Sequence, residues 1–550
     1  MTTQAYPPRG KKLTRFGEAT IALTMIGLCA YAVITGAQQA QGDMTTGTTV
    51  ISMTQVLGRP TNSSISISVL SPNDKEVYAE YGAISGKYTG KTSVQALKAK
   101  VPVELSIDKL QANTKYFYRL RHRDGSSGEF VTGKEYSFQT QRPPGTNFVF
   151  AIQADTHTER LNRMYHPDLY WINMANVRQG NPDFYVTLGD DFGIDNLTGM
   201  GLGLSPQTVA QVYINHRAFL GAEGASAPIF TVNGNHEQAA KYLLNGTPNN
   251  PAVWAGRSRN AYFPQPTIGD GKFYTGDMEP VEHIGMLNDY YAWTWGDALF
   301  ITLDPYWHSD KVVDNALGVG PVEAAATGAA PAAAMGGGMN AAATTGAEAV
   351  AGMQTNAAGM GTGGMGAGRD IWEITHGEAQ YRWFEKTLRE SKAKYKFVFA
   401  HHVLGTGRGG AEMAHLGEWG GYSQSGQWEF DKKRPGWELP IHQLMVKYNV
   451  SAFFQGHDHL YVQQEKDGIV YQELPTPADS NYGDGGNADA YKTGNKFSAA
   501  GHLRVSISPD AARVDYIRAW MPKDLNDQRK QGEVGFSYEI KPAKAAASTK

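Results

Sequence analysis

Short stretches in which apolar and polar residues alternate dominate the first part of the chain. They run from about residue 63 to residue 140, with Gly, Asn, Asp and Ser between them, as in "SISISVL", "EVYAEYGA", "VPVELSI", "KYFYRLRHRD" and "KEYSFQT". Such alternation with turn residues between the stretches predicts antiparallel strands. We therefore predict a small all-β sandwich domain over residues 50–142. The two prolines of "QRPPGT" that follow predict an extended linker.

After the linker, apolar strands alternate with helical patterns. "FVFAIQAD" is followed by the helix-like "DLYWINMANVRQ", and "DFYVTLGDD", "TVAQVYINHRAFLG" and "PIFTVNGNHE" continue the alternation. It resumes at "DALFITLDPYW" and runs through "YKFVFAHHVLG" and "VSAFFQGHDHLY". This order is typical of α/β domains. We place the domain at residues 146–525 and expect residues 526–550 to form a C-terminal tail.

Low-complexity sequence rich in Ala and Gly interrupts the second domain between residues 317 and 369. It carries five methionines, and thioether sulfur is a ligand for copper, but their irregular spacing favours a flexible insert without chemistry of its own. The insert leaves the chain just after a predicted strand. Because loops at the carboxyl ends of strands surround α/β active sites, we expect it to lie near such a site.

Composition excludes some classes of partner. The chain has 550 residues, of which 41% are hydrophobic and 19% charged, enough for a large buried core. Its formal net charge is -3, and no long block of Lys and Arg marks a polybasic groove, so nucleic acid is not expected as a partner.

The N-terminus has the pattern of a targeting segment. Basic residues precede an uncharged apolar run from Ile21 to Ala37, which predicts an export signal removed after Ala37, although the run is nearly long enough to stay as a membrane anchor. We therefore expect residues 1–40 to be a signal peptide or an anchor, and the protein to be periplasmic or secreted. The single cysteine, Cys29, lies in this run, so a metal site in the mature chain must use nitrogen and oxygen ligands.

Polar side chains of a few types follow the predicted strands of the second domain. A single D-x-H triplet carries little weight, but here five apolar runs each end in Asp, Asn or His. The residues concerned are Asp155, His157, Asp190, Asp191, Asn235, His236, His401, His402, His457 and His459. In an α/β sheet the carboxyl ends of strands meet at one edge, so these groups are expected to converge. Carboxylate, amide oxygen and imidazole are ligands for borderline divalent metals, and a bridging carboxylate would allow two ions to be held close together.

The ordered set D-x-H, G-D, G-N-H-E, H-H and G-H-x-H resembles the calcineurin-like metallophosphoesterase superfamily over about residues 146–520. The small β domain before it is similar to the fibronectin-like domain of purple acid phosphatases. The resemblance implies a four-layer α/β/β/α sandwich preceded by a fibronectin type III-like domain. It also implies two divalent or trivalent metal ions as cofactors, either Fe, Mn or Zn.

The resemblance further implies roles for individual residues. Asp155, His157, Asp190 and His459 would surround one metal. Asp190 would bridge to a second, bound also by Asn235, His457 and one histidine of the 401–402 pair. We favour His401, since the family's ligand is usually the first residue after the strand, but the sequence leaves His402 open. His236 would lie beside the phosphate and assist departure of the leaving oxygen.

One position departs from the family pattern. Purple acid phosphatases place an iron-binding tyrosine where "GDDFG" supplies Gly193, so the sequence does not favour a purple ferric centre and leaves Fe, Mn and Zn open. Asp191 or Asp195 could support the site from behind the ligands. Arg408 on a glycine-rich loop could meet a phosphate oxygen, and His308 could line the pocket, although a solvated arginine and a surface histidine are the simpler interpretations.

These patterns lead to one function and two alternatives. We expect an exported dinuclear metallophosphoesterase that hydrolyses phosphate monoesters by attack of a metal-bridging hydroxide, with His236 and Asp190 as catalytic residues and phosphorylated small molecules or peptides as substrates. Membrane contact would occur only through the N-terminal anchor. The alternatives are a phosphodiesterase of the same fold and a non-catalytic binding protein of the cell envelope.

Overall fold

The computed structural model describes residues 53–195, 197, 202–268, 273–313, 370–405 and 408–543. The predicted signal peptide or anchor at residues 1–40 and the insert at 317–369 lie outside the described residues. In the described part of the chain, no helix is long and apolar enough to cross a membrane.

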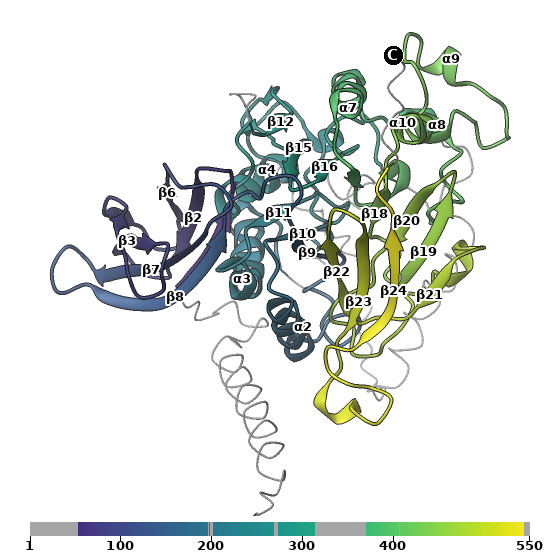
Figure 1. Ribbon diagram of the computed structural model, residues 1–550. Helices are drawn as coiled ribbons and strands as arrows, with labels where there is room; N and C mark the ends of the chain where they lie inside the picture. The colour runs from purple at the N-terminus through teal and green to yellow at the C-terminus, as the bar shows by residue number, and fades with distance from the viewer. Residues whose placement is uncertain are drawn as a thin grey trace, which may run out of the picture. The chain divides into compact units, whose positions relative to one another are not determined.

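A two-sheet β sandwich forms the first part of the described chain (Figure 1). One sheet has the order β1-β2-β6 and consists of Thr54–Gly58, Ile65–Leu70 and Val103–Ile107. The other consists of β3 Lys75–Gly82, β4 Gly90–Lys91, β5 Gln95–Leu97, β7 Lys115–Asp124 and β8 Val131–Gln139. Alternate residues such as Tyr116, Tyr118 and Leu120 face the shared core, as the period-two pattern predicts.

Two larger sheets form the second part. A six-stranded sheet has the order β11-β10-β9-β22-β23-β24, from Ile229–Thr231, Phe184–Thr187, Phe148–Gln153, Gly501–Ile507, Ala512–Arg518 and Val534–Ile540. An eight-stranded sheet has the order β12-β15-β16-β17-β18-β20-β19-β21, from Thr275–Gly276, Tyr291–Trp295, Ala298–Thr302, Tyr395–Phe399, Ala452–Gln455, Ile469–Glu473, Tyr461–Lys466 and Asn495–Phe497. A small hairpin pairs β13 Pro280–Val281 with β14 Gly285–Met286.

The two sheets pack face to face through one apolar core. Phe184 on β10 contacts the rings of Trp293 and Phe300, which lie on strands of the other sheet, and the centroid distances are 5.8 and 5.1 Å. Aromatic pairs of this kind bury large areas and fix the relative position of the sheets.

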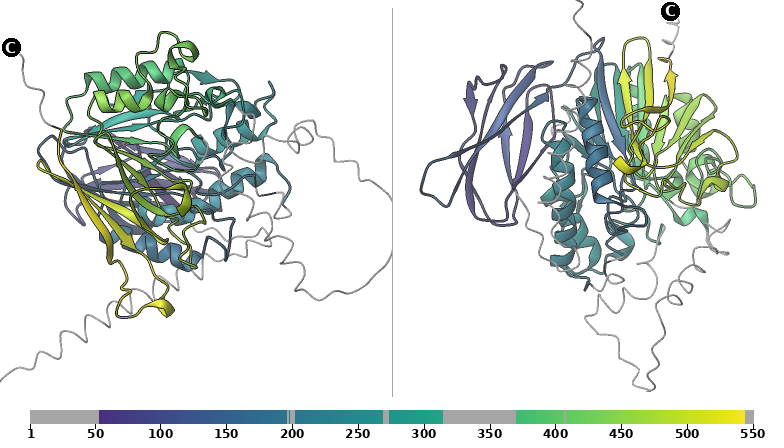
Figure 2. Two further views of the ribbon diagram at one scale, coloured as in Figure 1. Left: turned by 90° about the vertical axis from the view of Figure 1, so that its right-hand side faces the viewer. Right: turned by 90° about the horizontal axis from the view of Figure 1, so that it is seen from below.

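Helices cover the outer faces of both sheets (Figure 2). On the six-stranded side they are α2 Pro167–Gln179, α3 Pro206–Gly224 and α4 Pro251–Tyr262. On the eight-stranded side, α7 Glu378–Glu390 and α10 Ile441–Lys447 pack onto β17 and β18, with the short α8 Gly417–Gly420 and α9 Phe430–Lys433 nearby. The amphipathic pattern of α7 explains its placement, because Tyr381, Phe384 and Leu388 recur at helical spacing and are buried. The result is the predicted α/β/β/α arrangement.

The six-stranded sheet extends beyond the end that we predicted for this domain at residue 525. Strand β24 lies within the predicted tail and pairs antiparallel with β23. The sequence "VGFSYEI" alternates, and Phe536, Tyr538 and Ile540 contact the core between the sheets. Burial of this apolar face is the physical reason that the segment is a strand.

Candidate metal centre

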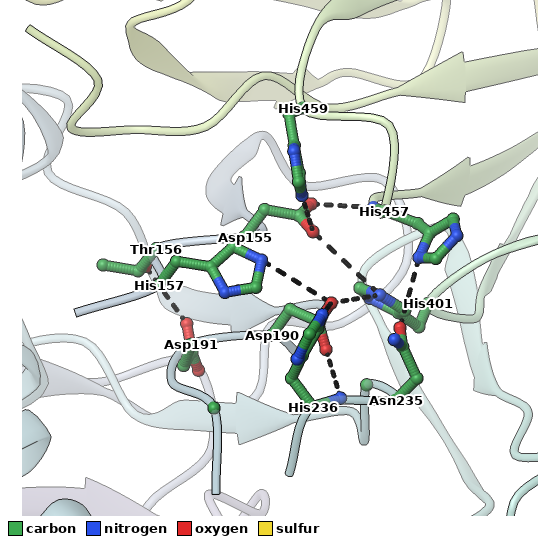
Figure 3. A network of polar contacts seen from close by, with 12 residues as sticks. Asp155, Thr156, His157, Asp190, Asp191, Asn235, His236, His401, His457 and His459 are labelled. Atoms are coloured by element: carbon green, nitrogen blue, oxygen red, sulfur yellow. Dashed lines mark hydrogen bonds and ion pairs between the residues drawn. The ribbon is translucent and has the colours of Figure 1, made fainter. Parts of the chain in front are cut away.

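The predicted site residues follow strands whose carboxyl ends meet. Strands β9, β10 and β11 run parallel to one another, as do β17 and β18 in the other sheet. Asp155 and His157 follow β9, Asp190 follows β10 and Asn235 follows β11. His401 follows β17, and His457 and His459 follow β18. The structure therefore brings all seven predicted metal ligands to one place between the sheets (Figure 3).

The backbone turns sharply at this place. Asp155, His157, Asp190, His457 and His459 all have positive φ, between 48° and 81°. This left-handed conformation is costly for residues other than glycine, and it aims successive side chains inward from the end of a strand. Two glycines permit the close approach of the loops. A Cβ on Gly234 would collide with Asp190, and one on Gly456 would collide with Asp155.

One group of ligands consists of Asp155, His157, Asp190 and His459. Nε2 of His157 lies 3.7 Å from Oδ2 of Asp190, and Nε2 of His459 lies 3.4 Å from Oδ1 of Asp155. The rings of His157 and His459 meet edge to face, with centroids 5.1 Å apart. These are the four residues that the family resemblance assigns to the first metal.

A second group is built around His401. Its Nε2 lies 3.0 Å from Oδ2 of Asp190, and its Nδ1 donates to the carbonyl oxygen of Leu188 at 2.8 Å. Because Nδ1 carries the hydrogen that is donated to this carbonyl, Nε2 is the nitrogen whose lone pair is available to a metal. Nδ1 of His457 lies 3.1 Å from Oδ1 of Asn235, so both atoms face the same point. Asp190 thus lies between the two groups, where the resemblance places the bridging ligand.

The histidine beside His401 has other neighbours. Nδ1 of His402 lies 3.1 Å from the hydroxyl of Tyr306, and its ring is tilted by 31° against that of His457, with the centroids 3.9 Å apart. One ring nitrogen of His402 lies within 4.8 Å of ring nitrogens of His401 and His457, so His402 could also bind a metal. Of the two neighbouring histidines, however, it is His401 that reaches Asp190. The geometry therefore favours His401, which the sequence preferred without excluding His402.

Buried polar atoms provide the test of whether metals fit here. Asp155 Oδ1, His157 Nε2, Asp190 Oδ2 and His401 Nε2 are buried, and within the described chain they face one another instead of forming hydrogen bonds elsewhere. Such atoms are expensive to bury unless a cation or hydrogen bond satisfies them. Four overlapping sets of three Asp and His residues have ligand atoms within 4.8 Å of one another. The donor set is nitrogen and oxygen only, which suits Fe, Mn or Zn.

Charge balance within the site follows from these contacts. Burial alone would raise the pKa of Asp190, but His401 and His236 lower it well below its usual range. Burial lowers the pKa of His157 well below its ordinary value, which favours the neutral imidazole that binds metals.

His236 lies at the exposed edge of the site and is held from behind. Its Nδ1 lies 2.9 Å from both carboxylate oxygens of Asp195, and its backbone N–H donates to Asp190 Oδ1 at 2.8 Å. Burial would lower the pKa of His236, but Asp190 and Asp195 raise it to about 9. Asp195 thus supports the site from outside the ligand set, as the sequence allowed. Asp191 supports it differently, by accepting hydrogen bonds from Thr156 and Gln153.

Two glutamates to which the sequence assigned no role hold the site together. Oε1 of Glu159 accepts from Nδ1 of His157 at 2.9 Å, and Oε2 accepts from Gly193 N at 2.8 Å. Glu237 accepts from the backbone N–H groups of Asp190, Asp191 and Gly234 at 2.7 to 3.0 Å. Glu237 is the last residue of the motif G-N-H-E, and Glu159 lies two residues after the motif D-x-H. Their closeness in sequence to predicted ligands is the feature from which a supporting role could have been predicted.

Arg408 and His308, which the sequence offered as further residues of the substrate pocket, both bind other parts of the protein. Nη1 of Arg408 donates to the carbonyl of His457 at 2.6 Å and to Asp458 Oδ1 at 2.9 Å, so this arginine holds the loop of two ligands rather than extending freely into solvent. His308 pairs with the fully buried Asp289 at 3.0 Å, and its side chain is only 17% exposed, so it is not a surface histidine.

Comparison with known proteins supports the architecture. No family model matches the sequence, and no curated protein matches it significantly. Among solved structures, the chain is similar to the purple acid phosphatase PPD1 from yellow lupin (Lupinus luteus) seeds, with a TM-score of 0.53, 16% identity, and 89% of this chain and 74% of that chain covered. It is also similar to PhoD, with a TM-score of 0.53, 15% identity, and 90% and 92% covered. The chain therefore has the α/β sandwich fold of metallophosphoesterases, preceded by an N-terminal β domain.

Proposed function

We propose that the protein is an exported dinuclear metallophosphoesterase that hydrolyses phosphate monoesters. The observation that carries this proposal is the convergence of Asp155, His157, Asp190, Asn235, His401, His457 and His459 from five strand ends into one buried cluster. A protein that only binds or scaffolds has no physical need to bury so many facing ligand atoms. The fold shared with a purple acid phosphatase and PhoD agrees with the same chemistry.

The residues of the site would bind two metal ions in two overlapping groups. Asp155, His157, Asp190 and His459 would hold one ion, and Asp190, Asn235, His401 and His457 the other. When bound, two such ions would supply a water-derived nucleophile and neutralise negative charge on the phosphoryl oxygens. Water adds to phosphorus, the ester P–O bond breaks, and the released alcohol takes a proton on its oxygen.

His236 would assist the departing oxygen. Asp195 occupies Nδ1 of the ring, which leaves Nε2 directed to the edge of the site. In the protonated ring Nε2 also carries a hydrogen, and its hydrogen bond to the leaving oxygen would stabilise the charge that develops there. Asp195 fixes the orientation of the ring, so it acts through His236 rather than on the substrate.

Substrates would be phosphorylated small molecules or peptides outside the cytoplasm. The apolar run that precedes the described residues supports export, and the absence of a polybasic block in the sequence argues against nucleic acid as a substrate.

The test is hydrolysis of an aryl phosphate monoester and the matching diester by the chain from about residue 41 onward. Each substrate is assayed with added Mn, Zn or Fe and with a chelator as control. We expect chelator-sensitive turnover with the monoester preferred. A protein that binds two metals per chain but hydrolyses neither ester would contradict the proposal, and preferred cleavage of the diester would replace its monoester part.

A further inference from the structure

We propose that Arg160 binds the phosphoryl group of the substrate and favours dianionic monoesters over diesters. This inference rests on the proposed phosphoesterase function and deepens it. Arg160 lies three residues after His157, in the loop that leaves the first ligand motif.

The direction of substrate entry follows from which side chains at the site reach solvent. The side chains of Asp155, His157, Asp190 and His401 are 0% exposed. Those of His236 and Arg160 are 14% and 20% exposed. The side chain of His459 is also 10% exposed, so a phosphate ester from solvent would meet the metal cluster across His236, Arg160 and His459.

The guanidinium of Arg160 reaches the site. Nη2 lies 3.0 Å from Nε2 of His236, the atom that would face the leaving oxygen. Nε pairs with Oε1 of Glu159 at 3.3 Å, and this same oxygen contacts His157. Glu159 thereby fixes the guanidinium and a metal ligand relative to each other.

The two Nη nitrogens have only weak partners for a cation. Nη1 contacts the thioether sulfur of Met164 at 3.3 Å, and Nη2 contacts an imidazole nitrogen. Within the residues that the structure describes, neither contacts an oxygen acceptor. Arg142 shows the contrast, because two of its nitrogens bind both oxygens of Asp183. The planar fork of an arginine matches two oxygens of a phosphoryl group, and Nη2 of this fork lies beside His236 at the exposed edge of the site.

The backbone of the Arg160 loop is well anchored. The N–H of Arg160 donates to the carbonyl of His157 at 2.8 Å, and its own carbonyl accepts from Arg163 and Met164 at 3.1 Å. The side chain of Asn481 donates to the carbonyl oxygen of Arg163 at 2.6 Å, so the loop is also hydrogen-bonded to a segment far away in the sequence. A guanidinium on such a loop is held in place before the substrate arrives, and this reduces the entropy lost on binding.

Charge gives the arginine a preference between esters. A monoester carries up to two negative charges at neutral pH and a diester carries one, so an added cation attracts the monoester more strongly. Loss of Arg160 should therefore weaken monoester turnover more than diester turnover.

The experiment compares Arg160→Gln, Arg160→Lys and the control Arg163→Gln in the metal-loaded chain. Arg163 lies on the same loop, but it is exposed, so its loss removes an equal charge from the loop without removing the proposed contact. Loss of a charge-assisted hydrogen bond predicts a decrease of about 10- to 100-fold in monoester kcat/KM for Arg160→Gln. Arg160→Lys should recover part of this loss, and Arg163→Gln should leave kcat/KM within about twofold.

Binding of inorganic phosphate, measured by calorimetry, gives a readout that does not depend on turnover. We expect Arg160→Gln to weaken phosphate binding while metal content and melting temperature stay unchanged. Equal loss of monoester and diester turnover would overturn the charge preference, and unchanged phosphate affinity in Arg160→Gln would overturn the contact itself. A wild-type chain active on monoesters would in either case leave the proposed function standing, whereas a metal-loaded wild type that neither binds phosphate nor hydrolyses an ester would overturn both.

Discussion

Oε1 of Glu159 lies 2.9 Å from Nδ1 of His157, two positions earlier in the chain. A carboxylate can only accept at this point, so Nδ1 carries the proton and Nε2 is left for a metal. The second oxygen of Glu159 accepts from the backbone N–H of Gly193, which occupies the position where purple acid phosphatases have a tyrosine ligand. One buried side chain therefore sets the ligand atom of a histidine and the path of the loop after Asp190.

Glu159→Gln should weaken metal binding. An amide has one acceptor oxygen, so the variant satisfies either the His157 ring or the Gly193 N–H, but not both. We expect metal affinity to fall about 10- to 100-fold. Titration of the metal-free protein against a competing chelator measures the affinity, with the exposed Glu465→Gln as control. An affinity equal to that of the wild type would show that Glu159 does not position His157.

Asp190→Ala should remove both metals. Asp190 Oδ2 lies 3.0 Å from His401 and 3.7 Å from His157, so its loss deprives both ligand groups. Elemental analysis should show fewer than one ion per chain, with nearly all monoester turnover lost. Asp467→Asn is the control, since that carboxylate is 59% exposed and binds His442 outside the site. A variant of Asp190 that retains two ions would contradict its bridging position.

Alanine at each of the paired histidines should separate their roles. His401→Ala should release one ion per chain, because Nε2 of His401 faces Asp190. His402→Ala should retain both ions, since of the two rings it is that of His401 that reaches Asp190. Metal stoichiometry of the two variants decides between them, and loss of an ion only in His402→Ala would reverse the assignment.

Glu223 should make stability depend on pH. Burial raises the pKa of this carboxyl to about 7, although Arg178 opposes the shift from 3.6 Å away. The folded protein then binds a proton more tightly than the unfolded chain, whose glutamate titrates near 4.3. The stabilisation is complete below that pH and is lost as the pH rises through about 7.

The loss should amount to about 4 kcal/mol in the free energy of unfolding. Glu223→Gln should remove this part of the pH dependence and raise the melting temperature at pH 8. Urea unfolding between pH 4.5 and 8 measures the effect, with Glu378→Gln, whose side chain is 70% exposed, as control. A parallel pH dependence in wild type and Glu223→Gln would show that this carboxyl does not titrate in the window.

Sequence pattern predicted the architecture and the residues that converge, and the reason is geometric. The carboxyl ends of strands in an α/β sheet meet at one edge. A polar residue that follows an apolar run can therefore be assigned to that edge even when the direction of its side chain is not known. The choice between His401 and His402 depends on the direction of each side chain, because consecutive residues after a strand point in different directions. Glu159 and Arg160 depend on the turn that follows His157, and spacing alone does not specify such a turn. Strand β24 is different, because its alternating pattern was present in the predicted tail.

Left-handed backbone at Asp155, His157, Asp190, His457 and His459 has a consequence for how such a chain evolves. For the three histidines this backbone costs about 1–2 kcal/mol relative to the ordinary conformation, whereas aspartate adopts it more readily. Glycine at any of these positions would relieve the cost but forfeit a ligand. A related chain that binds no metal here should therefore show glycine or asparagine at these positions first, because nothing would then offset the cost of the backbone.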